Sequence, residues 1–186
     1  MAVVHPGSEL TPTKDELLAA WVPTQPWWPA GAPALPAVAT FRFDDPAGAV
    51  GIETFLLPVG DQVVQVPLTY RDAPLEQGTL VGEMEHSALG RRWIHDGPSD
   101  PVYVAEATAV ITEGRGEVEL VDGEGQLIPR RASTASVNGS GGGDDGGTGE
   151  LTVGRLVPGE VPADATATLT GTWQGRDEPV VLAWLS

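Results

Sequence analysis

The sequence predicts an α+β fold. One helical pattern lies near the N-terminus and another near the middle, and both are followed by segments in which apolar and polar residues alternate. This order favours an antiparallel sheet with a helix covering one face. The chain has 186 residues, 41% of them hydrophobic, which suits one domain or a compact pair of subdomains. We expect two helices and about eight strands.

The first helix is expected directly after Thr13. Thr13 and Glu16 have the spacing of a capping box, and Pro23 would end the helix. The apolar residues of this segment fall on one stripe, which would face a sheet: Leu17, Leu18, Trp21 and Val22.

Three strands are expected next, at 38–43, 52–59 and 62–70. Gly60-Asp61 is a two-residue hairpin signal between the second and the third. Pro67 has no backbone N–H, so the third strand should lie at a sheet edge or carry a bulge there. A turn-rich segment follows.

A short strand at 91–95 precedes the second helix. Asp100 can cap that helix, Pro101 suits its first turn, and Gly114 suits its C-terminal cap. Its apolar side would be formed by Tyr103, Ala107, Val110 and Ile111.

The remainder of the chain is expected to be β-rich. We therefore divide the chain into two subdomains, 1–114 and 115–186, with the second packed on the first. A low-complexity, Gly-rich segment at 136–149 predicts a mobile loop. The expected strands of this part are 117–121, 126–130, 150–157, 165–173 and 179–186.

The composition excludes several classes of function. The net charge is −16 and Lys14 is the only lysine, so nucleic acid and anionic membranes are poor partners. The lack of cysteine excludes disulfides and zinc–thiolate sites. No apolar run reaches the roughly 20 residues of a membrane span, and the N-terminus lacks the pattern of a signal peptide. We expect a cytoplasmic protein.

Catalytic and metal-binding motifs are scarce. "GGGDDG" at 141–146 matches a phosphate-loop pattern, but its two aspartates would repel the anion, and a linker is the better interpretation. His86 lies near Glu83 and Glu85, which allows a metal site, although a solvated turn is favoured. We therefore expect no metal, no cofactor and no catalytic residue that local sequence identifies.

Aromatic residues suggest a contact surface. "WVPTQPWWPAG" at 21–31 contains half of the six tryptophans. Adjacent residues on an extended chain point in opposite directions, so one of Trp27 and Trp28 should enter the core and the other should be accessible. With Trp93, they are candidate contacts for a sugar or a partner. Two basic side chains beside Trp93 complete this set: Arg91 and Arg92.

Three segments together resemble the N-terminal cap domain of bacterial maltokinases, which phosphorylate maltose. They are "LLAAWVPTQPWWPAG", "VVQVPLTYRDAPL" and "HDGPSDPVYVAEATAVI". The resemblance covers roughly 13–112 and departs from the pattern at Pro26, where a basic residue is usual. It implies a cystatin-like arrangement, with a helix against a curved antiparallel sheet. The full length is also similar to stand-alone actinobacterial proteins with a cap-like domain, sometimes labelled α-glucan branching proteins.

The kinase activity itself is not expected. Gly154-Arg155 stands where the resemblance would require a strand lysine, and no H-x-D…N loop is present. We therefore expect a non-catalytic accessory or regulatory module that acts with a sugar kinase or α-glucan enzyme, as a monomer or weak homodimer. Two alternatives remain: a module that binds maltose or α-glucan through its tryptophans, and a small enzyme whose pocket would join His95 and Asp96 to Arg91 or Arg92.

Overall fold

A large, curled antiparallel sheet forms the centre of the structure, a computed structural model that describes residues 1–142 and 149–186. Within these residues the sheet has seven strands in the order β2-β6-β7-β5-β4-β3, and β11 pairs with the end of β5. The strands are β2 (Leu10–Thr11), β3 (Ala39–Asp44), β4 (Gly51–Val59), β5 (Gln62–Arg71), β6 (Leu80–His86), β7 (Gly90–Asp96) and β11 (Leu156–Val157).

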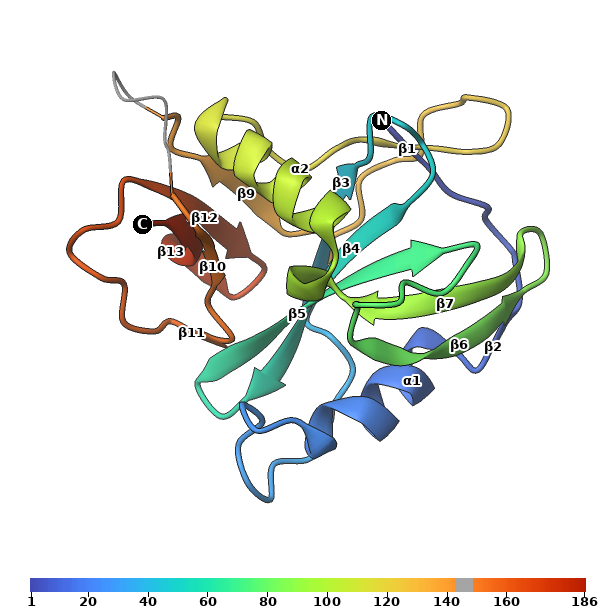
Figure 1. Cartoon of the computed structure of the whole chain (residues 1–186), viewed down its shortest axis with the longest axis horizontal. Coiled ribbons are helices and arrows are strands. Elements are labelled where there is room, and N and C mark those ends of the chain that lie inside the picture. The colour runs from blue at the N-terminus through green and yellow to red at the C-terminus, as the bar shows by residue number, and fades with distance from the viewer. Residues whose placement is uncertain (143–148) are drawn as a thin grey trace.

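A small antiparallel sheet lies beside the large one (Figure 1). Its order is β10-β13-β12-β9, and a short parallel pair, β1 with β8, lies elsewhere. These strands are β1 (Ala2–Val3), β8 (Leu120–Val121), β9 (Ser136–Gly139), β10 (Leu151–Val153), β12 (Ala167–Trp173) and β13 (Arg176–Leu185).

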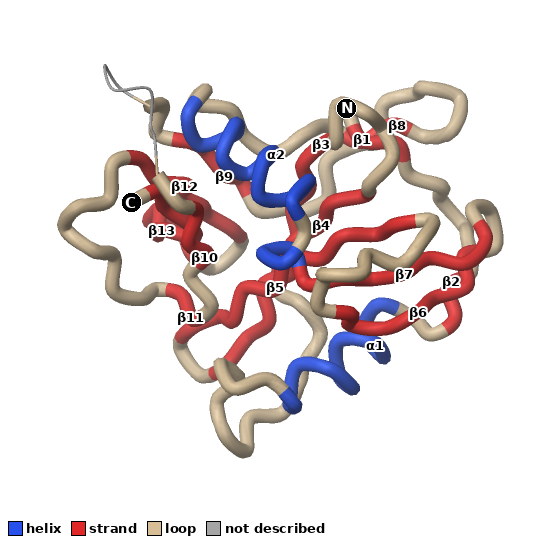
Figure 2. The backbone as a smooth tube through the Cα atoms, in the orientation of Figure 1, coloured by secondary structure: helices blue, strands red, loops and turns tan. Residues whose placement is uncertain are grey.

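The two helices lie on opposite sides of the large sheet (Figure 2). Helix α1 (Lys14–Trp21) packs on one face, where Leu18 and Trp21 join Phe55 and Ile94 in one buried cluster. Helix α2 (Pro101–Thr112) covers the other face and also packs on the small sheet. Short 3-10 turns adjoin both helices, at Val22–Thr24 and Gly97–Ser99. The predicted α+β class is confirmed.

The capping residues predicted from the sequence, Thr13 and Asp100, do cap the N-termini of the two helices. The Thr13 hydroxyl accepts from the backbone N–H of Glu16, and the Glu16 carboxylate accepts in return from the Thr13 N–H at 2.8 Å. The Asp100 carboxylate accepts from the Val102 N–H at 2.9 Å. Gly114 has a φ of +66°, so it ends α2 in the left-handed conformation that glycine adopts without strain.

Pro67 lies inside the sheet rather than at an edge. The Gln65 N–H donates to Arg155 O, so it points away from β4. Backbone N–H groups two residues apart on a strand point to the same side, so the nitrogen of Pro67 also faces away from β4. On that side β5 pairs with β11 through Val63 and Val64 and with β7 from Leu68 onward. Proline is tolerated because its missing N–H faces the gap between these two partners.

The chain passes from the small sheet to the large one at Gly154 and Arg155. β10 pairs with β13 before this point and β11 pairs with β5 after it. The buried side chain of Gln65 holds the crossing, because its Nε2 donates to Gly154 O at 3.2 Å and to Leu182 O at 2.9 Å. One amide thus joins both sheets.

Three strand predictions need correction. The turn-rich segment contains β6, whose alternation is interrupted by a register shift between Leu80 and Gly82. The hairpin expected at 117–130 is reduced to β8 and a bridge between Val121 and Leu127. The Gly-rich loop expected from 136 begins later, because Ser136–Gly139 form β9, and 143–148 lie outside the described residues.

The proposed boundary at 114 runs through a shared core. Phe41 and Leu56 of the large sheet, Val110 of α2, and Leu169 and Leu182 of the small sheet belong to one buried cluster. The division into 1–114 and 115–186 therefore remains a prediction about folding units, and the two parts are packed tightly together.

The contact between β9 and α2 should tolerate no side chain at Gly139. A Cβ there would lie 2.1 Å from the Val110 carbonyl oxygen and 2.8 Å from Ile111 Cα, and this backbone cannot move aside cheaply. Gly139→Ala should lower the free energy of unfolding by about 2 kcal/mol or more, measured by urea denaturation. Gly123→Ala is the control, since its nearest neighbour would be 3.7 Å away; equal losses in both variants would contradict the proposed clash.

Candidate functional site

Trp27 and Trp28 are adjacent in the proline-rich segment after α1, but they differ in burial. Trp28 is buried, and its indole N–H donates to Ala32 O at 3.1 Å. Trp27 is half-buried, with its ring edge-on to Trp21 at a centroid distance of 5.6 Å. Trp28 is therefore the core residue of the pair, and Trp27 is the more accessible one.

Arg155, at the point where the chain crosses between the sheets, lies over the ring of Trp27. Its guanidinium carbon lies 4.5 Å from the Trp27 ring centroid, and Nη2 donates to the Asp96 carboxylate. Burial raises the pKa of Asp96 above its usual value, although the charge of Arg155 opposes this shift. Arg155 thus connects the crossing to β7 and to the aromatic segment. The cation lies within the distance of a cation–π contact with Trp27.

The candidate residues of β7 separate onto two faces of the sheet. Ile94 belongs to the cluster under α1, so Arg92 and Asp96 share its side while Arg91, Trp93 and His95 take the other. Arg91 pairs with Glu83 and Glu85, and its Cζ is 5.9 Å from the Trp93 ring. His95 contacts the Leu75 N–H and Asp96 pairs with Arg155, so a pocket that joins them to Arg91 or Arg92 stays a prediction.

A buried polar cluster at the start of α2 was only partly foreseen. Besides capping the helix, Asp100 accepts two hydrogen bonds of 2.7 Å from Arg71 and one of 2.7 Å from Thr69. Burial alone would raise the pKa of Asp100, but these donors and the Val102 N–H outweigh it and lower the pKa. Every donor here is a structural partner, so the cluster fixes α2 against β5.

His95 adjoins this cluster as a structural residue. It is 1% exposed, and its Nε2 accepts from the Leu75 N–H at 3.2 Å. Burial lowers the pKa of His95, so the neutral form is favoured despite the nearby Asp100 charge. An imidazole whose accessible lone pair is already used by backbone is poorly placed to act as a base.

A second buried ionic network joins α1 to the sheet. Lys14 Nζ lies 2.5 Å from Glu53 Oε2, and the Arg42 guanidinium lies 2.8 Å from the same oxygen. The Tyr70 hydroxyl donates to it at 3.3 Å. Burial lowers the pKa of Lys14, and Glu53 partly restores it. Sequence analysis missed this network because its members are far apart in the chain.

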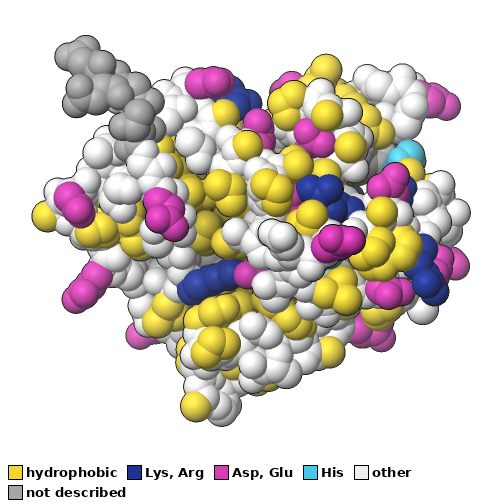
Figure 3. Space-filling view, in the orientation of Figure 1, with side chains coloured by type: hydrophobic (Ala, Val, Ile, Leu, Met, Phe, Trp, Pro, Cys, Tyr) yellow, Lys and Arg dark blue, Asp and Glu magenta, His cyan; other side chains and the backbone are white. Residues whose placement is uncertain are grey.

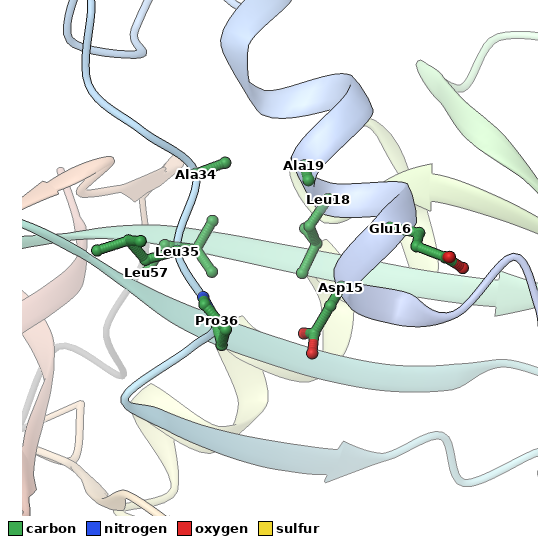
Figure 4. A pocket seen from close by; sticks show the side chains of 8 residues that line it. All are labelled: Asp15, Glu16, Leu18, Ala19, Ala34, Leu35, Pro36 and Leu57. Carbon is green, nitrogen blue, oxygen red and sulfur yellow. The ribbon is translucent and has the colours of Figure 1, made fainter.

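A shallow groove of about 250 Å³ lies between α1 and the segment that returns from the tryptophans. Asp15 and Leu18 of α1 lie across from Leu35 and Pro36 (Figure 4), with Leu57 of β4 at the base. The groove offers no grouping of donors and acceptors, so by itself it indicates packing rather than chemistry.

Metal-binding and surface features add little to these sites. Within 1–142 and 149–186, no three or more His, Asp or Glu residues are grouped to hold a metal ion. Most of the "GGGDDG" motif lies outside the described residues. Acidic side chains are spread widely over the face in Figure 3, with basic ones in a few separate places. Neither described helix has the length and apolar content needed to cross a membrane.

Comparison with protein families addresses the first half of the chain. Residues 21–100 match the family model of the maltokinase N-terminal cap domain. The match supports the predicted cap-like family. No curated protein and no solved structure matched the chain. The cap-like segment contains Trp27, Trp28, β7 and Asp100, whereas Arg155 lies beyond it.

The Asp100 cluster generates a prediction with a defined pH dependence. Asp100→Asn should lower the free energy of unfolding by about 3 kcal/mol at neutral pH, because Arg71 loses its buried partner. The folded pKa is below the ordinary value of 3.8, so the wild-type advantage is complete above that value and disappears as pH falls through the folded pKa. Urea unfolding of both proteins across this range measures it. A difference that persists unchanged in acid would refute the assignment.

Proposed function

We propose that this protein is a non-catalytic accessory or regulatory module that acts with a partner enzyme of maltose, trehalose or α-glucan metabolism in the cytoplasm. The observation that carries the proposal is the cap-domain match over 21–100. A cap domain is a module that accompanies a catalytic domain, and the kinase motifs named above were not found in this sequence.

The arrangement of the candidate residues is consistent with a binding role. Asp100, His95 and Asp96 are buried and packed against structural partners. Arg91 and Trp93 lie together on β7, and Arg91 is well exposed, with 57% of its side-chain surface accessible. An exposed arginine beside an aromatic ring is a pairing that protein interfaces favour. We propose Arg91 and Trp93 as the partner contact.

Partner capture tests this role. The tagged chain should recover an enzyme of this metabolism from cell extract after crosslinking, identified by mass spectrometry, and adding the chain to that purified enzyme should change its rate. Arg91→Ala combined with Trp93→Ala should reduce recovery at least about fivefold, as expected when a hot-spot pair is lost.

Two controls make the capture result interpretable. Leu127→Ala alters a side chain that is 59% exposed in another loop and should recover as much enzyme as the wild type. An unrelated acidic protein of similar size controls for capture of basic proteins by a chain of net charge −16. Recovery of no enzyme of this metabolism, or equal recovery with the acidic control, would count against the proposal.

Direct sugar binding by Trp27, Trp28 and Trp93 receives less support. Trp28 is buried, Trp27 is covered by Arg155, and Trp93 lies on the other side of the sheet from both. These positions do not favour a single platform on which the three indoles contact one sugar chain. We expect millimolar maltose to leave tryptophan fluorescence unchanged. Saturable quenching that Trp93→Phe removes and Trp27→Phe retains would instead favour a sugar site on β7.

A further inference from the structure

A second cavity, larger than the groove beside α1, lies between the N-terminal segment and the large sheet. Its volume is about 600 Å³, within the range of small-molecule sites. The walls come from the N-terminal segment before α1, the loop between β3 and β4, and the faces of β5, β6 and β7. Its basic and imidazole lining residues are His5, Lys14, Arg42, His86 and Arg92. The lining also contains the neutral Ser8 and Tyr70 and the acidic Asp44 and Asp45.

This cavity concentrates positive charge in an acidic protein. The chain has 10 Lys and Arg residues against 26 Asp and Glu, together with 3 His. Lys14, Arg42 and Arg92 line the cavity, as do His5 and His86. Two carboxylates, Asp44 and Asp45, also line the cavity, so its three Lys and Arg side chains outnumber its acids, the reverse of the chain as a whole.

Of the Lys and Arg side chains that line the cavity, Arg92 has no ion pair with a carboxylate of the described residues. Among the residues that the structure describes, no Asp or Glu lies within ion-pair distance of its guanidinium, and its one internal hydrogen bond is a 3.5 Å contact with Arg91 O. Arg91, next to it on the opposite face, has two carboxylates. A half-buried, unpaired guanidinium beside a cavity is free to bind an anion in two-pronged geometry.

The carboxylates that line or adjoin the cavity already have other partners. Glu53 is shared by Lys14 and Arg42, which leaves that trio with one excess positive charge. Asp45 accepts from the backbone N–H groups of Ala47, Ala49 and Val50. Asp44 contacts the amino group of Met1 at 2.8 Å. None of these acids neutralises Arg92.

His86 supplies a neutral donor. Its Nδ1 accepts from the N–H groups of Ala88 and Leu89 at 3.2 and 3.3 Å, which leaves the proton on Nε2. Burial lowers the pKa of His86, and the neighbouring His5, Arg92 and Lys14 lower it further. The crowding of positive charge around this ring is the situation that a bound anion would relieve.

We propose that this cavity binds a small phosphorylated organic molecule, with Arg92 as the principal phosphate contact and His86 and Lys14 as further donors. A phosphate monoester carries close to two negative charges at neutral pH and several acceptor oxygens, which suits this set of donors better than a single carboxylate does. The cavity is far larger than phosphate alone, and Tyr70, Met84 and Phe43 offer contacts for the organic part. This ligand site goes beyond the proposed accessory role and does not require a partner enzyme.

Isotope labelling can observe the cavity through a single probe. Because Lys14 is the only lysine, ¹⁵N-lysine labelling of the full chain gives one backbone amide signal, and it comes from a cavity residue. Titration with a hexose monophosphate at low ionic strength should shift this signal saturably. Inorganic phosphate should bind more weakly, because it lacks the organic part, and the free hexose should not bind.

The arginine variants give a matched comparison on one strand. Arg92→Gln should weaken hexose monophosphate binding about tenfold or more, as expected for loss of a charge-assisted contact, and Arg92→Lys should restore part of it. Arg91→Gln makes the same change in net charge on the other face and should alter binding less than about twofold. Urea unfolding of each variant confirms that it folds.

Three outcomes would overturn the assignment. They are no saturable shift with either phosphate probe, equal weakening in Arg91→Gln and Arg92→Gln, or binding of the free hexose as tight as that of its phosphate. A failure here leaves the partner-capture result unaffected, and a failure of partner capture leaves this titration unaffected, so the two proposals can be rejected separately.

Discussion

The buried amide of Gln65 is the interaction on which the rest of the structure depends. It lies on the central strand β5, is 1% exposed, and donates to carbonyls on the chain crossing and on β13. A buried carbonyl is costly without a donor, and Gln65 supplies one to Gly154 O. Leu182 O accepts from Gln65 and also from the Gly154 N–H at 2.8 Å, so the amide and the crossing together hold the small sheet against the large one. The shared core of α2, β4, β12 and β13 then excludes water.

This junction also brings a cation to one of the candidate aromatic residues. Because the crossing passes beside β5, Arg155 reaches both Asp96 on β7 and the ring of Trp27. The cap-like segment is thus joined to residues beyond it by a hydrogen bond, an ion pair and a stacked cation. A module built in this way presents the β7 surface around Arg91 and the cavity near Arg92 as two separate regions. One strand therefore carries a proposed partner contact on one face and a proposed ligand contact on the other.

Charge is distributed unevenly between the interior and the surface. Two buried or largely buried carboxylates, Glu53 and Asp100, each hold basic side chains in place, and both have a lowered pKa despite burial. Arg42 and Arg71 are paired in this way, and the chain has only 10 Lys and Arg residues in all. Arg92 has no such partner among the described residues, and the proposed ligand site depends on this difference. A buried ion pair is weak evidence of stability, but it does fix which elements lie next to each other.

The sequence by itself determined the local features of this protein. The capping box at Thr13, the cap at Asp100, the hairpin at Gly60-Asp61 and the alternation of β12 depend on neighbours within a few residues, and each was recognisable in the chain. The similarity of 21–100 to the cap domain was recognisable too, because its motifs are short and contiguous. Only the tertiary structure decided which of Trp27 and Trp28 is buried, why Pro67 is tolerated inside a sheet, and that β6 pairs with β7. The cavity likewise combines Lys14, Arg42, His86 and Arg92 from separate elements. Strand register and sheet curvature bring these residues together, and both depend on contacts between distant parts of the chain that no local pattern encodes.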